Sequence, residues 1–221
     1  MSFVFWSGIL FLAYLLGSFP SGYLIVRLLT QDDVRNIGSG STGATNVTRK
    51  AGVKAGLMTY VLDVGKGMLA VYLAGQLSGQ NVHVMGSAGA VAILGHMFPI
   101  FLKFQGGKGV ATGVGVFLLL APLPTLAVFA VWGLIFSITR TVSLGSVVAT
   151  GLLPVAIWAF EGVLAGKPAA IWVPKLLWGL GIGLLIISKH HENIRRLLSG
   201  TESSFKKQNS EVVNSQVASS E

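Results

Sequence analysis

Residues 110–160 read VATGVGVFLLLAPLPTLAVFAVWGLIFSITRTVSLGSVVATGLLPVAIWAF, and Arg140 is the only charged residue among them. A helix needs about 20 predominantly apolar residues to cross the hydrocarbon core of a bilayer, which is about 30 Å thick. The stretch is long enough for more than one crossing. It therefore predicts an all-α integral membrane protein.

The composition of the whole chain supports this prediction. Of its 221 residues, 52% are hydrophobic and only 11% are charged, and the mean hydropathy is +0.71. A typical globular domain has about 25% charged residues, so this chain lacks the polar surface that a water-soluble protein needs. The chain has no cysteine, which excludes disulfides, thiolate metal sites and a cysteine nucleophile.

Three other regions add crossings to those of residues 110–160. Residues 1–26 and 67–102 contain no Asp, Glu, Lys or Arg, and residues 171–189 form a further span if Lys175 extends its ammonium group to the interface. A polar turn at 78–81 divides the second region, and Pro122 and Pro124 divide the opening stretch. We therefore predict seven transmembrane helices, at 3–27, 55–77, 82–103, 109–121, 124–139, 144–162 and 171–189.

The distribution of cations predicts the orientation. The chain has 16 Lys and Arg against 8 Asp and Glu, and nearly all of the cations fall at alternate ends of the spans, leaving only Lys167 and Lys175 on the other side. The cation-rich side is expected to be cytoplasmic, which puts the N-terminus outside and the C-terminus in the cytoplasm. Residues 1–200 are expected to form one polytopic domain, followed by a polar, disordered cytoplasmic tail at 201–221.

The first candidate loop on the cytoplasmic side spans residues 33–49 and is dense in glycines and hydroxyls. Its glycines allow successive backbone N–H groups to surround an oxyanion, and Ser39, Thr42 and Thr45 can add hydroxyl donors. A helix that begins near Thr42 would direct its positive end at the ligand. The spacing of Gly38, Gly40 and Gly43 matches the dinucleotide-binding fingerprint, but no buried strand precedes it, so we reject that interpretation.

Two further segments on the same side contain residues that bind phosphate. In residues 103–112, glycines surround Lys108, although the spacing is not that of a Walker A loop. In residues 189–196, a helix would put His190 and Asn193 on one face, close to Arg196. Each segment alone has a simpler explanation, because glycines allow helices to pack closely and cations after a final helix often signal topology.

Polar residues inside the predicted spans are interpreted separately. Asp63 and Lys66 lie three positions apart, and an unpaired charge in a membrane is costly, so we expect a structural ion pair. His96 fits either a buried hydrogen-bonding role or a place in the site. The chain has no Gly-x-Ser-x-Gly and no His-x-x-x-x-Asp motif, which argues against a covalent acyl-enzyme. The cations and donors suit catalysis by positioning and electrostatics.

These motifs resemble the three signature motifs of the bacterial acyl-phosphate:glycerol-3-phosphate acyltransferases. The resemblance rests on GSGSTGATN at 38–46 with Arg49, on GGKGVAT at 106–112, and on His190-x-x-Asn193. It extends to GSFPSGY at 17–23, DVGKG at 63–67 and GHMFP at 95–99. The family usually has Asn where this chain has Ser41, which leaves the role of that position open.

The resemblance implies a seven-span enzyme of the bacterial inner membrane whose active site faces the cytoplasm. It would transfer a fatty acyl group directly from acyl phosphate to the 1-hydroxyl of sn-glycerol 3-phosphate, giving lysophosphatidic acid and phosphate. A phosphate oxygen or His190 would take the hydroxyl proton. The implied catalytic residues are His190, Ser39, Arg49 and Lys108, and the implied phosphate-binding residues are Ser39, Gly40, Thr42, Thr45, Asn46, Arg49, Gly107, Lys108 and Asn193.

The implied partners are glycerol 3-phosphate, acyl phosphate, membrane lipid and the enzyme that supplies acyl phosphate. No cofactor, metal ion or nucleic acid is expected. The competing hypothesis is a transporter or channel for phosphate-like anions, which would also use cations and glycine-rich loops. A non-catalytic scaffold would leave the chemistry of the loops unexplained.

Overall fold

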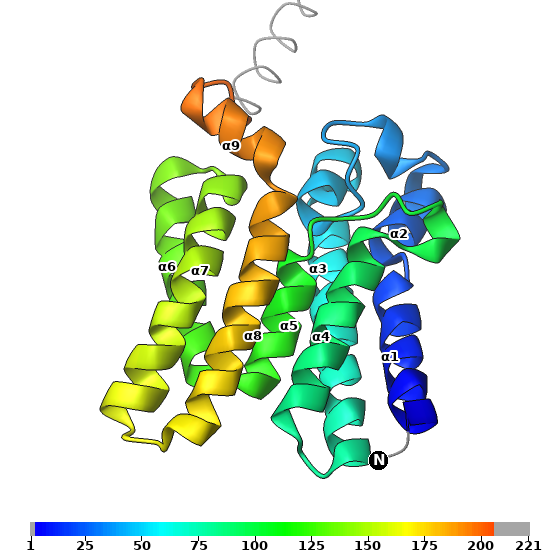
Figure 1. The fold of residues 1–221 in the computed structure, drawn as a ribbon. Coiled ribbons are helices and arrows are strands. Elements are labelled where there is room, and N and C mark those ends of the chain that lie inside the picture. Colours follow the sequence, from blue (N-terminus) through cyan, green and yellow to red (C-terminus); the bar gives the residue numbers. More distant parts are fainter. Residues whose placement is uncertain (1–2, 206–221) are drawn as a thin grey trace, which may run out of the picture.

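The computed structural model describes residues 3–205, and all the regular secondary structure in that range is helical (Figure 1). The prediction of an all-α membrane protein is therefore confirmed. Short 3₁₀ turns lie at Val34–Asn36 and Ile100–Leu102, and a π-helical segment, Trp158–Leu164, continues α7. The nine α-helices of the described range are α1 (Phe3–Ser18), α2 (Ser21–Thr30), α3 (Ala44–Ser78), α4 (Val82–Met97), α5 (Val110–Leu120), α6 (Pro122–Thr139), α7 (Val142–Ile157), α8 (Ala169–Ser188) and α9 (His191–Leu198).

Six helical stretches in the described range are long and apolar enough to cross a membrane. They are Val4–Thr30, Ala44–Ser78, Val82–Leu102, Pro122–Thr139, Val142–Leu164 and Ala169–Ser188. The seventh predicted span, 109–121, corresponds to α5, which has 11 residues. At 1.5 Å per residue, α5 is about 16 Å long, roughly half the thickness of the hydrocarbon core.

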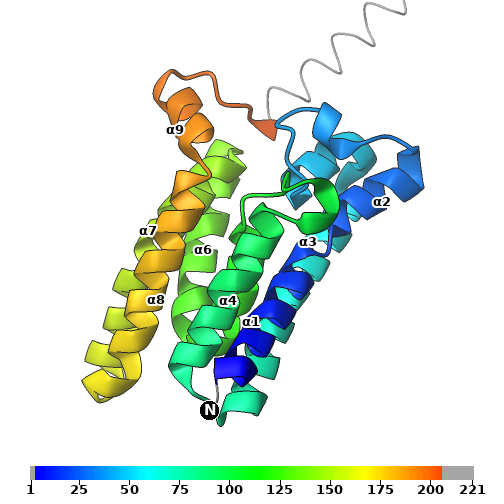
Figure 2. The same ribbon diagram turned by 45° about the vertical axis from the view of Figure 1, so that its right-hand side comes forward.

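The first two predicted spans differ from the observed helices in their bounds. The expected helix at 3–27 breaks after Ser18, and α2 leaves the axis of α1 at an angle (Figure 2). Pro20 explains the break, because proline disfavours helical geometry in the residue before it. The expected helix at 55–77 is part of the longer α3, in which Gly52 has a φ of 86° and interrupts the helical path.

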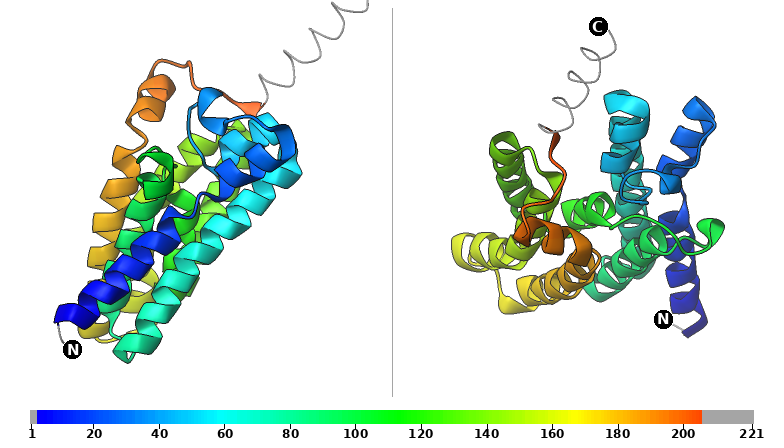
Figure 3. Two further views of the ribbon diagram at one scale, coloured as in Figure 1. Left: turned by 90° about the vertical axis from the view of Figure 1, so that its right-hand side faces the viewer. Right: turned by 90° about the horizontal axis from the view of Figure 1, so that it is seen from above.

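The helices pack in two groups, with α5 between them. One group contains α1, α3 and α4, and the other contains α6, α7 and α8 (Figure 3). Glycines allow close backbone contact within the first group and with α5. A methyl group on Gly17 would lie 2.0 Å from the carbonyl oxygen of Ala92 in α4, and one on Gly67 would lie 2.3 Å from that of Thr112 in α5. Close contact between α3 and α6 is sparse, and this separation leaves room for the cavity described below.

A buried polar cluster connects α2, α3 and α4. The carboxylate of Asp63 accepts a hydrogen bond of 2.6 Å from Ser21 and forms an ion pair of 2.7 Å with Lys66. Lys66 Nζ also donates to the carbonyl oxygen of Phe19 at 3.1 Å. The predicted Asp63–Lys66 ion pair is therefore confirmed. His96 is buried beside this pair, with Nδ1 3.6 Å from the Asp63 carboxylate.

Candidate active site

The three predicted loops lie at the end of the bundle opposite to the N-terminus (Figure 1). They converge on one cavity of about 1290 Å³. The first loop and the start of α3 contribute Ser39, Thr45 and Arg49, the second loop contributes Lys108, and the third contributes His190 and Asn193. These segments are far apart in the sequence. Their meeting at one cavity argues against three unrelated packing or topology devices.

The first loop is held in shape by Asn46. This side chain is 2% exposed, and its Oδ1 accepts from the backbone N–H of Ser39 at 3.3 Å. Its Nδ2 lies 2.9–3.0 Å from the carbonyl oxygens of Val34, Ile37 and Ser41. The amide is thus engaged by the loop itself. Asn46 therefore holds the loop in shape, and because it also lines the cavity, its contact with phosphate stays a prediction.

Not every residue expected to bind phosphate lines the cavity. Gly40, with a φ of 65°, supports the turn, and Thr42 is 5% exposed. Neither residue contributes to the cavity wall, and the same is true of Gly107. Gly107 instead supports Lys108: its N–H donates to the carbonyl oxygen of His96 at 3.1 Å, and a methyl group on it would lie 2.0 Å from His96 Nε2. These glycines therefore shape the loops and do not form the cavity surface.

Arg49 projects from α3 and has an unused donor. Its Nε is buried and has no hydrogen-bond partner among residues 3–205, and its guanidinium lies 5.9 Å from the centre of the Phe205 ring. A buried N–H group without an acceptor is rare in native proteins and calls for an explanation. An anionic ligand in the adjoining cavity would supply the missing acceptor.

Lys108 is paired with the third loop. Its Nζ donates to Asn193 Oδ1 at 2.5 Å. Burial lowers the pKa of Lys108 to about 8, because a desolvated ammonium group is less stable, although the charge of Glu202 opposes this effect. The ammonium is therefore protonated over most of the neutral range and remains available to a phosphate.

His190 immediately precedes α9 and is 3% exposed. Its Nδ1 lies 2.8 Å from the carbonyl oxygen of Ile186. Since a carbonyl only accepts hydrogen bonds, Nδ1 carries the proton and Nε2 keeps its lone pair in the neutral ring. Burial lowers the pKa of His190 to about 4, so the imidazole is neutral at pH 7.

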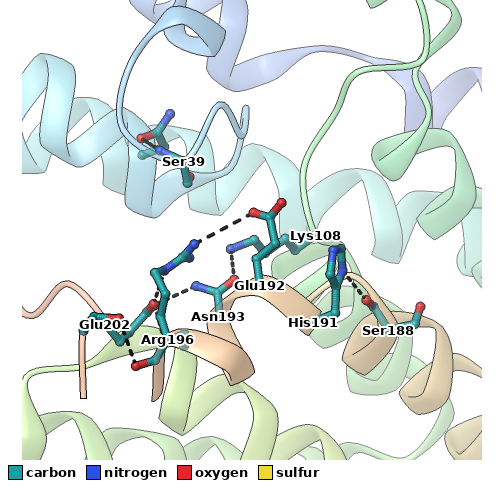
Figure 4. Close-up of polar contacts among 11 residues, drawn as sticks. Ser39, Lys108, Ser188, His191, Glu192, Asn193, Arg196 and Glu202 are labelled. Carbon is teal, nitrogen blue, oxygen red and sulfur yellow. Dashed lines mark hydrogen bonds and ion pairs between the residues drawn. The ribbon is translucent and has the colours of Figure 1, made fainter. Parts of the chain in front are cut away.

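One residue that organises the site, Glu202, was not predicted from the sequence. This carboxylate accepts from Ser143 Oγ at 2.7 Å, from Asn193 Nδ2 at 2.6 Å and from Arg196 Nε at 2.7 Å (Figure 4). Burial alone would raise the pKa of Glu202, but these three hydrogen bonds outweigh it and lower the pKa. Arg196, whose charge also fits a topology signal, is thereby held at the cavity.

The predicted tail begins at Thr201, so Glu202 and Phe205 belong to the segment that was expected to be disordered. Phe205 packs edge-on against Phe136 with ring centres 6.0 Å apart, and its backbone N–H donates to the carbonyl oxygen of Arg140 at 3.1 Å. That expectation is corrected for residues 201–205, which close one side of the cavity. Residues 206–221 lie outside the described range. No spacing or periodicity in the sequence around Glu202 marks it as part of a site.

The polar end of the cavity has an excess of positive charge. Four cations line the cavity: Arg49, Lys108, Arg140 and Arg196. Of the two carboxylates that line it, Asp63 is paired with Lys66 and Glu202 with Arg196, and His190 is neutral. Figure 4 shows Ser39 on the loop that faces this group. Within residues 3–205, no three His, Asp or Glu side chains are close enough together to bind a metal ion. The arrangement suits an anion that carries more than one negative charge.

The remainder of the cavity is largely apolar, with Asp63, Thr125, Ser146 and Thr150 as polar exceptions, and it opens sideways between α3 and α6. Lining residues near this opening are exposed on the outer surface: Val53, Leu57, Phe129 and Ile138 range from 41% to 74%. Tyr60 of α3 stacks on Phe129 of α6 with ring centres 6.5 Å apart. Deeper in the bundle the lining residues are buried. The cavity therefore joins a cationic end to an apolar channel that communicates with the membrane-facing surface.

Comparisons with known proteins agree on one family. The family model for glycerol-3-phosphate acyltransferase matches residues 7–200. The chain is 43% identical over 194 residues to the glycerol-3-phosphate acyltransferase of Syntrophotalea carbinolica, covering 88% of this chain and 94% of the relative. With the enzyme of the same name from Trichlorobacter lovleyi, identity is 46% over 195 residues, and the coverage is again 88% and 94%.

Solved structures give the same result. The chain superimposes with a TM-score of 0.80 on the crystal structure of PlsY (YgiH), an integral membrane glycerol 3-phosphate acyltransferase, in its glycerol 3-phosphate form. Sequence identity is 42%, with 90% of this chain and 95% of that chain covered. For the lysophosphatidic acid form the TM-score is 0.78 and the identity 40%, with the same coverage.

Proposed function

Because the chain belongs to the glycerol-3-phosphate acyltransferase family, we propose that it transfers a fatty acyl group from acyl phosphate to the 1-hydroxyl of sn-glycerol 3-phosphate. The products are lysophosphatidic acid and inorganic phosphate. The observation that carries the proposal is the single cavity that joins a cationic end to an apolar channel. The cationic end suits the phosphate of the acceptor, and the channel suits the alkyl chain of the donor.

The reaction that we propose needs no covalent intermediate on the enzyme. The oxygen of the 1-hydroxyl attacks the carbonyl carbon of the acyl phosphate, a new C–O ester bond forms, and the bond from that carbon to the phosphate oxygen breaks. Phosphate leaves with the electron pair. Arg49, Lys108 and Arg196 hold the two substrates together and balance the negative charge that develops on the carbonyl oxygen and on the leaving group.

The proton of the attacking hydroxyl needs an acceptor, and the comparison of pKa values favours a phosphate oxygen. His190 is a weak base, because its pKa is lowered to about 4, whereas a phosphate monoester has a second pKa of about 6. His190 Nε2 can still accept a hydrogen bond from the hydroxyl and orient it. We propose that His190 orients the acceptor and that phosphate takes the proton.

Replacing His190 tests this division of roles. In His190→Ala the rate should fall by about 10²–10³-fold, because the hydroxyl loses the group that orients it. The pH dependence of kcat should keep its shape, because the titrating group belongs to the substrate phosphate. If the acidic limb of the pH profile disappears in His190→Ala, His190 is the base and the proposal is wrong on this point.

The side opening between α3 and α6 supports a route for the donor. An acyl chain gains about 0.8 kcal/mol for each methylene that leaves water, so acyl phosphate partitions into the bilayer. It can reach the cationic end without crossing a polar surface, because Val53, Leu57 and Phe129 make the opening apolar. Glycerol 3-phosphate is polar and enters from the aqueous side.

We also propose the topology that the cations predict. The cavity faces the cytoplasm at the inner membrane of a bacterium, the N-terminus is outside, and α5 with its flanking loops completes a seventh crossing. The cation-rich loops lie at the cavity end of the bundle, whereas Lys167 and Lys175 lie near the opposite end, where Lys175 pairs with the buried carboxylate of Glu161 at 2.8 Å. This asymmetry supports the orientation.

The competing hypothesis of an anion transporter receives less support. A permeation path needs polar groups near the midplane and on both sides of the membrane. Below the cationic end, the lining of this cavity consists largely of apolar side chains, and its deepest members are buried in the hydrophobic core of the bundle, among them Phe117, Leu153 and Ile182. An apolar pocket with a packed end suits an alkyl chain better than a conducted anion.

The proposal is tested with the purified full chain in detergent, supplied with radiolabelled glycerol 3-phosphate and palmitoyl phosphate. We expect labelled lysophosphatidic acid and release of one phosphate per product. Lys108→Met should abolish product, and Lys50→Met is the matched control, because Lys50 pairs with Asp32 and does not line the cavity. Absence of lysophosphatidic acid from the parent enzyme would overturn the assignment.

A further inference from the structure

The apolar channel ends at a floor of buried side chains. Four helices contribute to it, and each contributing residue lines the cavity yet is less than a tenth exposed. Because these residues have little exposed surface, protein side chains enclose the channel on their side at this depth. The residues are Phe117 of α5, Thr125 and Val128 of α6, Leu153 of α7 and Ile182 of α8.

The layer beneath the floor is solid. Leu120 and Ile157 lie one helical turn beyond the floor residues Phe117 and Leu153, are at most 3% exposed, and do not line the cavity. A methyl group placed on Gly179 of α8 would lie 3.3 Å from Ile157 Cδ1 and 3.9 Å from Phe117 Cε1. The side chains of Ile157 and Phe117 therefore pack close to the backbone of α8, and a longer ligand cannot pass between them without displacing them.

The side opening stops above the floor. Along α6, Ile138 and Phe129 are 74% and 41% exposed, but Val128 and Thr125, which follow toward the far end, are 9% and 2% exposed. The Tyr60–Phe129 stack closes the gap between α3 and α6 at the lower edge of the opening. A chain that enters through the opening therefore has its distal end in a closed pocket.

The depth of this pocket matches the length of a membrane acyl chain. Ser143 hydrogen-bonds to Glu202 at the cationic end, and Leu153 lies ten positions further along the same helix, α7. At 1.5 Å per residue, the floor is about 15 Å below the cationic end. Half of a hydrocarbon core that is about 30 Å thick is also about 15 Å, which is the depth that one lipid chain fills.

We propose that Phe117 and Leu153 set the length of the acyl chain that the enzyme transfers, an inference that rests on the proposed function. The discrimination is steric. The donor is already in an apolar environment before it binds, so a longer chain gains little from the pocket, but it must overpack the floor or fold back. Overpacking a close-packed apolar site by a few carbons lowers kcat/KM by about tenfold.

The experiment compares the full-length enzyme with two variants, one in the floor and one in the channel above it. The donors are lauroyl, myristoyl, palmitoyl, stearoyl and arachidoyl phosphate in detergent micelles. Leu153→Ala deepens the pocket and should move the preference toward chains about two carbons longer. The value of kcat/KM for the longer donor, divided by that for the shorter donor, should change by about tenfold. Ala149→Leu fills the channel one turn above Leu153, on the same face of α7, and should move the preference toward shorter chains.

Two matched controls lie on the lipid-facing side of α7. Leu152→Ala makes the same truncation one position away, at a residue that is 39% exposed and does not line the cavity. Gly151→Leu adds bulk where a methyl group would meet nothing within 4 Å. Both controls should keep the parent's chain-length profile.

The proposal would be overturned if Leu153→Ala and Ala149→Leu were both active with an unchanged chain-length profile. It would also be overturned if a control variant changed the profile as much as the channel variant to which it is matched. If Leu153→Ala does not fold, judged by thermal unfolding and gel filtration, the result with Ala149→Leu decides, because its prediction has the opposite sign. Failure of the parent enzyme on every donor would refute the proposed function instead, so the two failures are distinguishable.

Discussion

Gly107→Ala gives the sharpest test of how the protein holds Lys108. Gly107 has no positive φ that would exclude alanine, so only the available space decides the outcome. A methyl group there would lie 2.0 Å from Nε2, 2.7 Å from Cε1 and 3.0 Å from Cδ2 of His96. Since an ordinary contact begins at 3.4 Å, the loop or the imidazole must move by roughly 1.4 Å.

The imidazole has little room to move. His96 is 6% exposed, its Nδ1 lies 3.6 Å from the Asp63 carboxylate, and that carboxylate is held by Ser21 and Lys66. The loop therefore moves and displaces Lys108. A misplacement of about 1 Å in a binding group can cost up to about 10²-fold, so we expect KM for glycerol 3-phosphate to rise by about tenfold to a hundredfold.

The assay measures KM for glycerol 3-phosphate at saturating acyl phosphate, with thermal unfolding as a check on folding. Gly133→Ala is the control, because a methyl group there meets nothing within 4 Å. When Gly107→Ala is added to His96→Ala, KM for glycerol 3-phosphate should rise much less than when Gly107→Ala is made in the parent enzyme. The reason is that the obstructing ring is gone. Gly106→Ala should not be rescued by His96→Ala, because its methyl group would meet the backbone oxygen of His96 at 2.1 Å. An unchanged KM in Gly107→Ala, or equal rescue of both glycine variants, would refute the steric reasoning.

Three further predictions follow from the charged groups. Burial lowers the pKa of Lys108 to about 8, so KM for glycerol 3-phosphate should rise as the pH increases through about 8 and the ammonium is lost. Lys108→Arg stays charged and should keep KM constant over this range. Identical pH profiles of the two enzymes would show that another group titrates. Asp63→Asn leaves Lys66 without its counter-charge and should destabilise the protein by about 3–5 kcal/mol, measured by thermal unfolding. The double variant Asp63→Asn/Lys66→Met should recover much of this stability. If the double variant is no more stable than Asp63→Asn, the pairing is contradicted. Glu202→Gln weakens charged hydrogen bonds worth about 1.5–3 kcal/mol each and should raise KM for glycerol 3-phosphate. Glu192→Gln, at a side chain that is 71% exposed, should leave KM unchanged. Equal effects of the two changes would contradict the role of Glu202.

Local sequence was sufficient for much of the fold, because the length and polarity of a segment decide whether it crosses a membrane. Pro122 and Pro124 correctly separate two helices, since Ala121 is the only residue between α5 and α6. The bounds near Pro20 and Gly52 were harder to predict. A proline or glycine in an apolar run permits several outcomes, and tertiary packing selects among them.

The candidate site divides in the same way. The chemical types of Arg49, Lys108 and His190 indicated phosphate chemistry, and all three line the cavity. Sequence could not show that Asn46 holds its own loop, because an amide suits this role and phosphate binding equally well. It also could not identify Glu202, because a single carboxylate in a polar segment has no periodicity or spacing that distinguishes it from a solvated one.

The sequence by itself determined the solvent of this protein, the side on which its cations gather and the kind of anion that they suit. These properties follow from composition and from short spacings along the chain, so they do not depend on how distant segments meet. Only the tertiary structure decided that Lys108 meets Asn193, that Glu202 holds both Asn193 and Arg196, and that Phe117 and Leu153 line the same cavity as these residues. Such contacts depend on how the helices pack against one another, which no local pattern specifies.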